Sequence, residues 1–280
     1  MAKQYILTQD DVRAFEKYLN MKEYSHHTIY SYSSTIRKFI DEFDGVLNQM
    51  NIIAYKEKLL DINKPQSVNL RLKGLSCFLR YKNIKDFNVK YIKCQRFPFL
   101  EHVLSNADYN YLKMRLRRDK EMKWYYLFWF LGATGCRVSE VIRVKVEDVE
   151  LGYVDMICKG QKLRRIYIPI HLQKELMKYI KQEHIPRGSF LWHNKNGERL
   201  EIVGIEHMCK VFAKKYGLNP TDVYPHAFRH RFAMNFLEAS GNDLILLADL
   251  LGHSNLETTR RYLQKTAWQQ RQALNQIVTW

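Results

Sequence analysis

The sequence contains few cysteines, and none of them lies close to another. Five cysteines occur in 280 residues, and no two of them are separated by only two residues. Disulfide frameworks and structural zinc sites both need cysteines paired at short, regular spacings. The scattered pattern argues against both kinds of site and fits a protein of a reducing compartment. The five are Cys77, Cys94, Cys136, Cys158 and Cys209.

Long apolar runs are also missing. The first residues, MAKQYILTQDDVRAF, lack the continuous apolar core of a secretion signal. No run elsewhere approaches the roughly 20 apolar residues that span a bilayer. The sequence shows no internal repeat and no low-complexity tract. We therefore expect a soluble, cytoplasmic protein.

Acidic residues are fewer than basic residues, and the difference is spread along the chain. Lysine and arginine number 45 against 29 aspartates and glutamates, which gives a formal net charge of +16 and a pI near 9.5. Residues 1–100 carry 17 basic and 10 acidic side chains, and the remainder carries 28 and 19. A polyanion such as nucleic acid is the natural partner of both parts. Charge alone does not establish this, because many basic proteins bind no nucleic acid.

Hydrophobic periodicity predicts that residues 1–85 form a small all-helical domain. Four stretches in this part carry apolar residues at helical spacing. The first follows a capping box of Thr8 and Asp11, the second follows Ser25, and the others cover 52–60 and 68–79. Basic side chains beside the apolar positions are candidate nucleic-acid contacts, although an ordinary solvated surface explains each of them as well. They are Arg37, Lys38, Arg71, Lys73 and Arg80.

A polar, basic linker is expected over 86–103, and a second domain over 104–280. A capping box at Ser105–Asp108 opens the second domain, which is predicted to be mostly helical. Two β-rich runs, 153–158 and 165–169, flank a basic turn that contains glycine, so they predict a hairpin. The expected fold class is therefore mainly α with a small β-hairpin: a helical domain followed by a mixed α+β domain.

Three short motifs in the second domain carry residues suited to phosphate chemistry. GATGCRVSE places Arg137 where a glycine turn enters a helix, and backbone amides favour an anion there. HAFR sets His226 and Arg229 three residues apart, on one face of a helix. LGHSN is typical of a turn and cap, and Tyr262 follows nine residues after His253.

Each of these residues also has an ordinary explanation. Arg137 and Glu140 can form a surface ion pair, the histidines can be hydrogen-bonded structural residues, and Tyr262 can be a core aromatic. Their order along the chain changes the interpretation. An arginine, a hairpin lysine, His-x-x-Arg, Gly-His and a tyrosine follow one another, and chance rarely produces the whole series.

The series resembles the tyrosine recombinase, or phage integrase, family over nearly the whole chain. The matching motifs are GATGCRVSEV, CKGQKLRRIYIP, HAFRHRFA and LGHSNLETTRRYL. The resemblance implies a helical core-binding domain and a mixed catalytic domain that close together around duplex DNA. Lys159 and Lys162 both flank the hairpin turn; the family pattern favours Lys159 for catalysis and leaves Lys162 as a DNA contact. The six implied active-site residues are Arg137, Lys159, His226, Arg229, His253 and Tyr262.

The chemistry of DNA strand cleavage agrees with these positions. A phosphodiester is anionic and gains charge at the five-coordinate transition state, so Arg137 and Arg229 suit it as planar donors to the non-bridging oxygens. A phenol has an ordinary pKa of about 10 and is mostly protonated at neutral pH. Tyr262 therefore needs cationic neighbours and a proton acceptor to act as the nucleophile.

The remaining positions handle protons. His226 is the expected base and His253 a donor to the phosphate, while Lys159 is the expected general acid for the leaving 5′ oxygen. The phosphotyrosine conserves the bond energy of the phosphodiester, so strand exchange through a Holliday junction needs no ATP, metal or other cofactor. The sequence offers no carboxylate cluster for two magnesium ions.

Two other functions share part of these features. A type IB topoisomerase uses similar residues to nick and reseal one duplex, but the compact chain and the close LGHSNLETTRRYL match disfavour it. A basic helical DNA-binding regulator without catalysis would explain the charge and the helices, but not the ordered series. The expected function is therefore site-specific DNA recombination.

The first capped helix begins near residue 8, which leaves no room for the arm-binding domain of larger integrases. The resemblance thus favours a simple two-domain enzyme similar to Xer proteins or to transposon resolvases and integrases. It implies action on short inverted repeats in double-stranded DNA by a homotetramer associated with the nucleoid. Integration, excision and resolution of a mobile element or replicon all remain open. The apolar tail after Lys265 is expected to pack on a neighbouring protomer, with packing on its own domain as the alternative.

Overall fold

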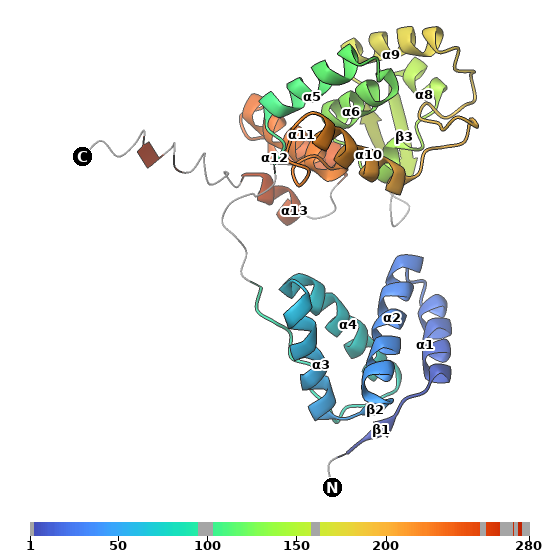
Figure 1. Cartoon of the computed structure of the whole chain (residues 1–280), viewed down its shortest axis with the longest axis vertical. Helices are drawn as coiled ribbons and strands as arrows, with labels where there is room; N and C mark the ends of the chain where they lie inside the picture. The colour runs from blue at the N-terminus through green and yellow to red at the C-terminus, as the bar shows by residue number, and fades with distance from the viewer. Residues whose placement is uncertain are drawn as a thin grey trace. The chain divides into compact units, whose positions relative to one another are not determined.

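The computed structural model describes residues 3–94, 103–157, 163–252, 256–263, 271 and 274–275. The chain divides into two compact units, Met1–Arg96 and Phe97–Trp280. Most elements are helices, and the strands of the described residues form two small antiparallel sheets (Figure 1). The prediction of a mainly α protein with a small β-hairpin is confirmed.

Four helices and one short strand pair form the first unit. Thr8 and Asp11 form the predicted capping box of α1, Ser25 caps α2, and Asn48 caps α3. Because Asn48 lies ahead of the predicted stretch 52–60, the third helix begins earlier than expected. The elements are β1 (Tyr5–Ile6), α1 (Gln9–Met21), α2 (His26–Phe43), β2 (Val46–Leu47), α3 (Gln49–Ile62) and α4 (Pro65–Tyr81).

The core of the first unit forms between the apolar faces of these helices. Phe15 of α1 meets Phe78 of α4 edge-on, with ring centroids 5.2 Å apart. Gly74 allows α4 to approach α2 closely, because a Cβ at this position would lie 3.2 Å from the Cα of Tyr32. Ile36 of α2 is fully buried in the same core. The basic side chains of α2 and α4 are therefore left toward the surface.

Within the described residues, the second unit contains nine α-helices, one 3₁₀ helix and one hairpin. The hairpin lies beside α8 (Figure 1), and its second strand also contacts α12. In chain order the elements are α5 (Asn106–Arg118), α6 (Met122–Thr134), α7 (Val138–Val141), α8 (Val146–Leu151), β3 (Tyr153–Ile157), β4 (Leu163–Tyr167), α9 (Ile170–Gln182), α10 (Ile202–Lys215), α11 (Pro225–Ala239), α12 (Leu244–Leu251), α13 (Leu256–Arg260) and the 3₁₀ helix η1 (Arg261–Leu263).

Helix α6 forms the centre of the second unit. Its side chains are apolar around most of the helix, and such a helix has to be covered on all sides. Leu127, Phe128, Phe130 and Leu131 have no exposed surface, and α5, α9 and α11 pack against the helix. Even so, no helix within the described residues is both long and apolar enough to cross a membrane.

The second strand of the hairpin differs from its predicted position. The sequence predicted 165–169, whereas β4 runs from Leu163 to Tyr167 and pairs these two residues with Ile157 and Tyr153. Pro169 has no N–H to give to the ladder and instead precedes α9 as its N-cap residue. The predicted strand therefore began two residues too late, which left Arg164 outside it.

Candidate active site

Arg137 lies where α6 ends and α7 begins. Gly135 ends α6 with a φ of 60°, and a Cβ there would lie 2.3 Å from the ring of Phe232, so only glycine fits. The backbone N–H of Arg137 donates to Glu140 Oε2 over 2.7 Å, and its Nη1 donates to Glu140 Oε1 over 2.9 Å. The Arg137 side chain is 39% exposed. Its guanidinium is thus oriented by Glu140 and remains accessible to an anion.

Arg229 lies on α11 and joins the ends of two other helices. Its Nη1 donates to the carbonyl of Gly135 at the end of α6, and its Nη2 donates to the carbonyl of Leu251 at the end of α12, both over 2.8 Å. The residue is only 1% exposed. Burial, together with the charges of Arg137 and Arg164, lowers the pKa of Arg229 to about 10. Arg229 is therefore still charged at neutral pH, and it lies within electrostatic range of Arg137.

Glu140 also binds an arginine that the sequence analysis did not select. Arg164 of β4 donates from Nη1 to Glu140 Oε1 and Oε2 over 2.6 and 2.5 Å. Burial opposes the charge on Glu140, but Arg164 and Arg137 hold the pKa of its carboxyl below its usual range. The alternation of β4 places Arg164 beside Ile166 on the buried face. With the strand correctly placed, this alternation is the sequence signal that identifies Arg164.

The charges of this cluster do not balance. Arg137, Arg164 and Arg229 each carry one positive charge and Glu140 carries one negative charge, so three cations meet one anion and leave a net charge of +2. The carbonyl groups that hold Arg229 are neutral. The cluster is therefore suited to bind an anion that reaches it from outside.

Tyr262 lies in η1 and is held in a small core of its own. It is 5% exposed and packs with Ala233 and Leu237 of α11 and with Leu247 and Leu251 of α12. Its electrostatic interaction with Arg229 raises the pKa of that guanidinium, although burial and the nearby arginines outweigh it. The tyrosine predicted as the nucleophile therefore lies close to one of the two predicted phosphate-binding arginines.

The ring next to Tyr262 is that of His230, which the sequence analysis did not select. The ring centroids of His230 and Tyr262 are 5.2 Å apart, and those of His230 and His226 are 4.6 Å apart. His226 and His230 share one face of α11 because they are four residues apart. His230 thus lies between the predicted base and the predicted nucleophile. Its place in HAFRH, one helical turn after His226, is the signal by which the sequence identifies it.

Three predicted site residues, Lys159, Lys162 and His253, lie outside the described residues. The described elements next to them are β3 and β4 on either side of 158–162, and α12, whose C-cap residue is Gly252. Among the described residues, no group of three or more histidine, cysteine, aspartate or glutamate side chains is placed to hold a metal ion.

The basic residues predicted on the first unit lie on α2 and α4. Lys38, Lys73 and Arg80 are exposed, whereas Arg37 and Arg71 are half-buried. Arg37 forms an ion pair with Glu16 of α1, so part of its charge serves the packing of the unit. The three exposed residues are the members of this set that are most accessible to a polyanion.

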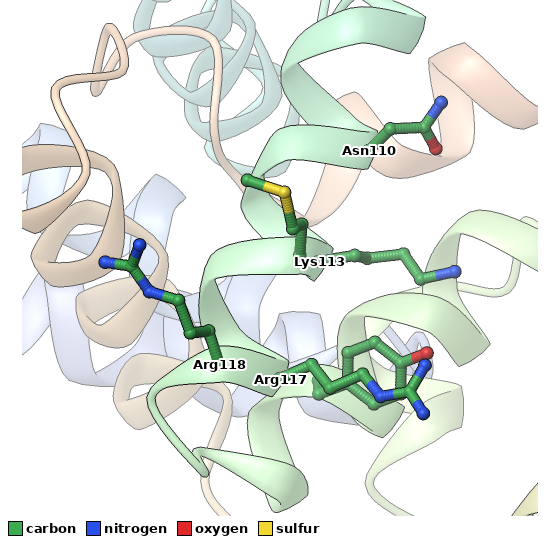
Figure 2. A pocket seen from close by; sticks show the side chains of 6 residues that line it. Asn110, Lys113, Arg117 and Arg118 are labelled. Carbon is green, nitrogen blue, oxygen red and sulfur yellow. The ribbon is translucent and has the colours of Figure 1, made fainter.

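A further basic surface lies on α5, where a cavity of about 440 Å³ opens beside the helix. Figure 2 shows Lys113 and Arg117 extending to one side of α5 and Arg118 to the other. Lys113 Nζ lies 4.0 Å from the centre of the Trp129 ring. Burial, with Arg231 and Arg117 adding to it, lowers the pKa of Lys113 to about 8. This pocket is separate from the arginine cluster; its lining residues are Asn110, Lys113, Met114, Arg117, Arg118 and Tyr125.

Comparison with protein families gives one match over most of the second unit. The model of the phage integrase family matches residues 101–268. Over almost the whole chain, the sequence is similar to tyrosine recombinase XerA of Thermococcus kodakarensis, with 28% identity over 269 residues that cover 94% of this chain and 93% of the relative. It is also similar to tyrosine recombinase XerC of Staphylococcus aureus, with 25% identity over 86% of this chain and 87% of the relative.

Solved structures share the fold of the chain. The Tn1549 transposon integrase in complex with transposon right end DNA aligns with a TM-score of 0.72 at 18% identity, over 95% of this chain and 98% of that one. A lambda integrase dimer bound to a COC′ core site aligns with a TM-score of 0.72 at 18% identity, over 93% and 77% of the two chains. At these identities the likeness concerns the fold.

Proposed function

Because the chain belongs to the phage integrase family and is a tyrosine recombinase, we propose that it cleaves DNA with Tyr262 as the nucleophile. The observation that carries the proposal is that Tyr262 lies close to Arg229, a buried member of an arginine cluster of net positive charge. The tyrosine oxygen attacks the scissile phosphorus, a 3′-phosphotyrosine forms, and the 5′ oxygen leaves with a proton. The topoisomerase and the non-catalytic regulator are not favoured, because the relatives that match over most of the chain are recombinases.

Arg137 and Arg229 bind the non-bridging oxygens of the scissile phosphate. Arg137 offers an accessible guanidinium already oriented by Glu140. Arg229 is fixed by two helix ends and need not reorder when DNA arrives. Donors fixed in advance are worth more to a reaction than donors that have to be ordered during it.

His226 accepts the proton of Tyr262, and His253 donates to the phosphate. The His230 ring lies against both the His226 ring and the Tyr262 ring, which supports this arrangement because it brings the base and the nucleophile to the same part of α11. An imidazole has an ordinary pKa of about 6.5, so it exchanges protons readily near neutral pH.

Strand exchange follows when a 5′ hydroxyl of a partner duplex attacks the phosphotyrosine. The reaction reverses the cleavage, releases Tyr262 and joins strands of two duplexes into a Holliday junction. One phosphodiester is broken for each one formed, so no cofactor is needed as a source of energy. We propose that the enzyme thereby integrates, excises or resolves a mobile element or replicon.

Lys159 is proposed as the general acid, and its replacement by alanine should slow cleavage by about 10²–10⁴-fold. A substrate with a 5′-bridging phosphorothiolate should restore the rate, because the sulfur leaves without a proton. Accumulation of the covalent adduct on both substrates measures the effect. Lys162→Ala is the matched control and should cleave both substrates nearly as the wild type does. Rescue seen only in the Lys162 variant would assign the role to that lysine instead.

Double-stranded DNA is the proposed partner of both units. In the first unit, proposed as the core-binding domain over residues 1–85, the exposed Lys38, Lys73 and Arg80 are suited to phosphate contacts that position the protein. The positive surface of the second unit, proposed as the catalytic domain over residues 104–280, adds the arginine cluster to these contacts. Short inverted repeats fit this arrangement, because two protomers related by a twofold axis then read equivalent half-sites.

A homotetramer on two synapsed sites is proposed as the active assembly. If the tail beyond Lys265 packs on a neighbouring protomer, truncation after Lys265 should leave binding to a single half-site nearly intact. The same truncation should weaken cooperative occupancy of the full site and strand exchange together. Gel-shift titrations on one-half-site and two-half-site DNA measure both effects. Unchanged cooperativity would mean that the tail packs on its own domain.

A further inference from the structure

We propose that Arg164 is a positioning residue for cleavage. It fixes Glu140, and through Glu140 the guanidinium of Arg137, relative to the C-terminal end of α12. The inference rests on the proposed function, since it concerns the same phosphate-binding cluster. Arg164 lies within the CKGQKLRRIYIP motif but is not one of the six implied active-site residues, and it acts without contacting the phosphate.

The donors of Arg164 are directed into the protein. Nη1 binds both oxygens of Glu140, while Nε and Nη2 bind the carbonyl of Leu250 over 3.1 and 2.7 Å. Its side chain is 3% exposed, against 39% for Arg137. A guanidinium enclosed in this way supports other groups and does not meet DNA.

The first of these groups is Arg137. Glu140 is the acceptor for both the backbone N–H and Nη1 of Arg137, so the direction of its carboxylate sets the direction of the Arg137 guanidinium. Arg164 also holds that carboxylate, with two short contacts from its Nη1. It also helps to keep the pKa of Glu140 low against the effect of burial. Without Arg164, the Glu140 carboxylate loses its orientation, and it also loses one of the charges that lower its pKa.

The second group is the end of α12. Arg164 binds the carbonyl of Leu250, and Arg229 binds the next carbonyl, that of Leu251. The side chain of Arg164 also packs on Gly252, where a Cβ would lie 2.4 Å from Arg164 Cδ. A shift of this helix end therefore displaces an acceptor of Arg229. Arg164 therefore contacts the groups that position both phosphate-binding arginines: Glu140, which holds Arg137, and the end of α12, which holds Arg229.

The test compares Arg164→Met with Arg165→Met in single-turnover cleavage of a nicked suicide half-site at saturating DNA. Arg165 is the matched control: it follows Arg164 on the same strand, carries the same charge, and pairs with Asp155 on the outer face. We expect Arg164→Met to lose about 100-fold or more in the rate of adduct formation, with half-site affinity near that of the wild type. Arg165→Met should keep the wild-type rate.

Three further measurements separate positioning from general stability. Arg164→Lys should recover only part of the rate, since an ammonium can pair with Glu140 but lacks the planar fork that also holds Leu250. Adding Glu140→Gln to Arg164→Met should slow cleavage little further, because both changes act through Arg137. This double variant removes both charges of the buried ion pair together, so it replaces Arg164→Met in the test if that variant does not fold. A 5′-bridging phosphorothiolate should not restore the rate.

Three results would overturn the inference. The first is cleavage by Arg164→Met as fast as by Arg165→Met. The second is a double variant whose loss in cleavage rate equals the product of the losses caused by Arg164→Met alone and Glu140→Gln alone. The third is rescue by the phosphorothiolate, which would place the effect on the leaving group. Failure of the proposed function is distinguishable, since the wild-type enzyme would then form no adduct through Tyr262.

Discussion

Tyr262→Phe is expected to abolish the covalent protein–DNA adduct on a nicked suicide substrate. The change removes the attacking oxygen but keeps the ring, which continues to fill the small core between α11 and α12. The fold and the affinity for a half-site should therefore stay near those of the wild type. A denaturing gel of protein trapped on labelled DNA measures the adduct, and a gel shift measures the affinity.

Tyr216→Phe is a matched control for this change. Tyr216 lies at the end of α10 and donates to Asp119 over 3.2 Å, so its replacement removes a hydroxyl of the same kind from another part of the unit. This control should form the adduct at the wild-type rate. An adduct that persists in Tyr262→Phe would show that another residue is the nucleophile.

Arg229→Ala is expected to slow adduct formation by at least about 10²–10³-fold, because one fixed donor to the developing phosphate charge is lost. The change also leaves the carbonyls of Gly135 and Leu251 without this donor, so the thermal midpoint should fall as well. The rate is therefore measured at saturating DNA and well below the midpoint. Arg137→Ala should show a similar loss of rate with a smaller loss of stability, because its side chain is partly exposed.

Arg231→Ala is the control for Arg229→Ala. Arg231 follows on the same helix but is directed to another surface, where its guanidinium lies 3.8 Å from the centre of the Tyr109 ring. Its loss should affect stability and leave the rate of cleavage near that of the wild type. Strand exchange retained by Arg229→Ala or Arg137→Ala would contradict the proposed binding of the phosphate.

Local signals account for the parts of the fold that the sequence predicted. The Thr8, Ser25 and Ser105 caps are formed as expected, because each needs only contacts within one helical turn. The hairpin was predicted for the same reason, since its strands are neighbours in the chain. Its second strand was predicted to end two residues too late, because apolar Ile168 suggested continuation of the strand, whereas Pro169 has no N–H for the ladder.

Contacts between distant segments account for the residues that the sequence did not reveal. Arg164 meets Glu140 across 24 positions of the chain and Leu250 across 86. Nothing local to LRRIYIP distinguishes this arginine from its exposed neighbour Arg165 until the strand register is known. His230 lies within a recognised motif, but its role depends on η1, which brings Tyr262 to its ring. Lys159, Lys162 and His253 stay predictions.

Because Arg229 and Arg164 are bound to helix ends, the cluster should bind the phosphorane more strongly than the phosphodiester from which it forms. Carbonyls at the ends of α6 and α12 hold these cations through dipoles, which orient a guanidinium without cancelling its charge. A carboxylate in the same place would orient it equally well but would repel the substrate. The excess of two positive charges therefore remains for the incoming group: the bound phosphodiester, with one negative charge, balances half of it, and the doubly charged phosphorane balances all of it. Attraction thus grows as the reaction proceeds, and binding of this kind lowers the barrier rather than merely retaining the DNA.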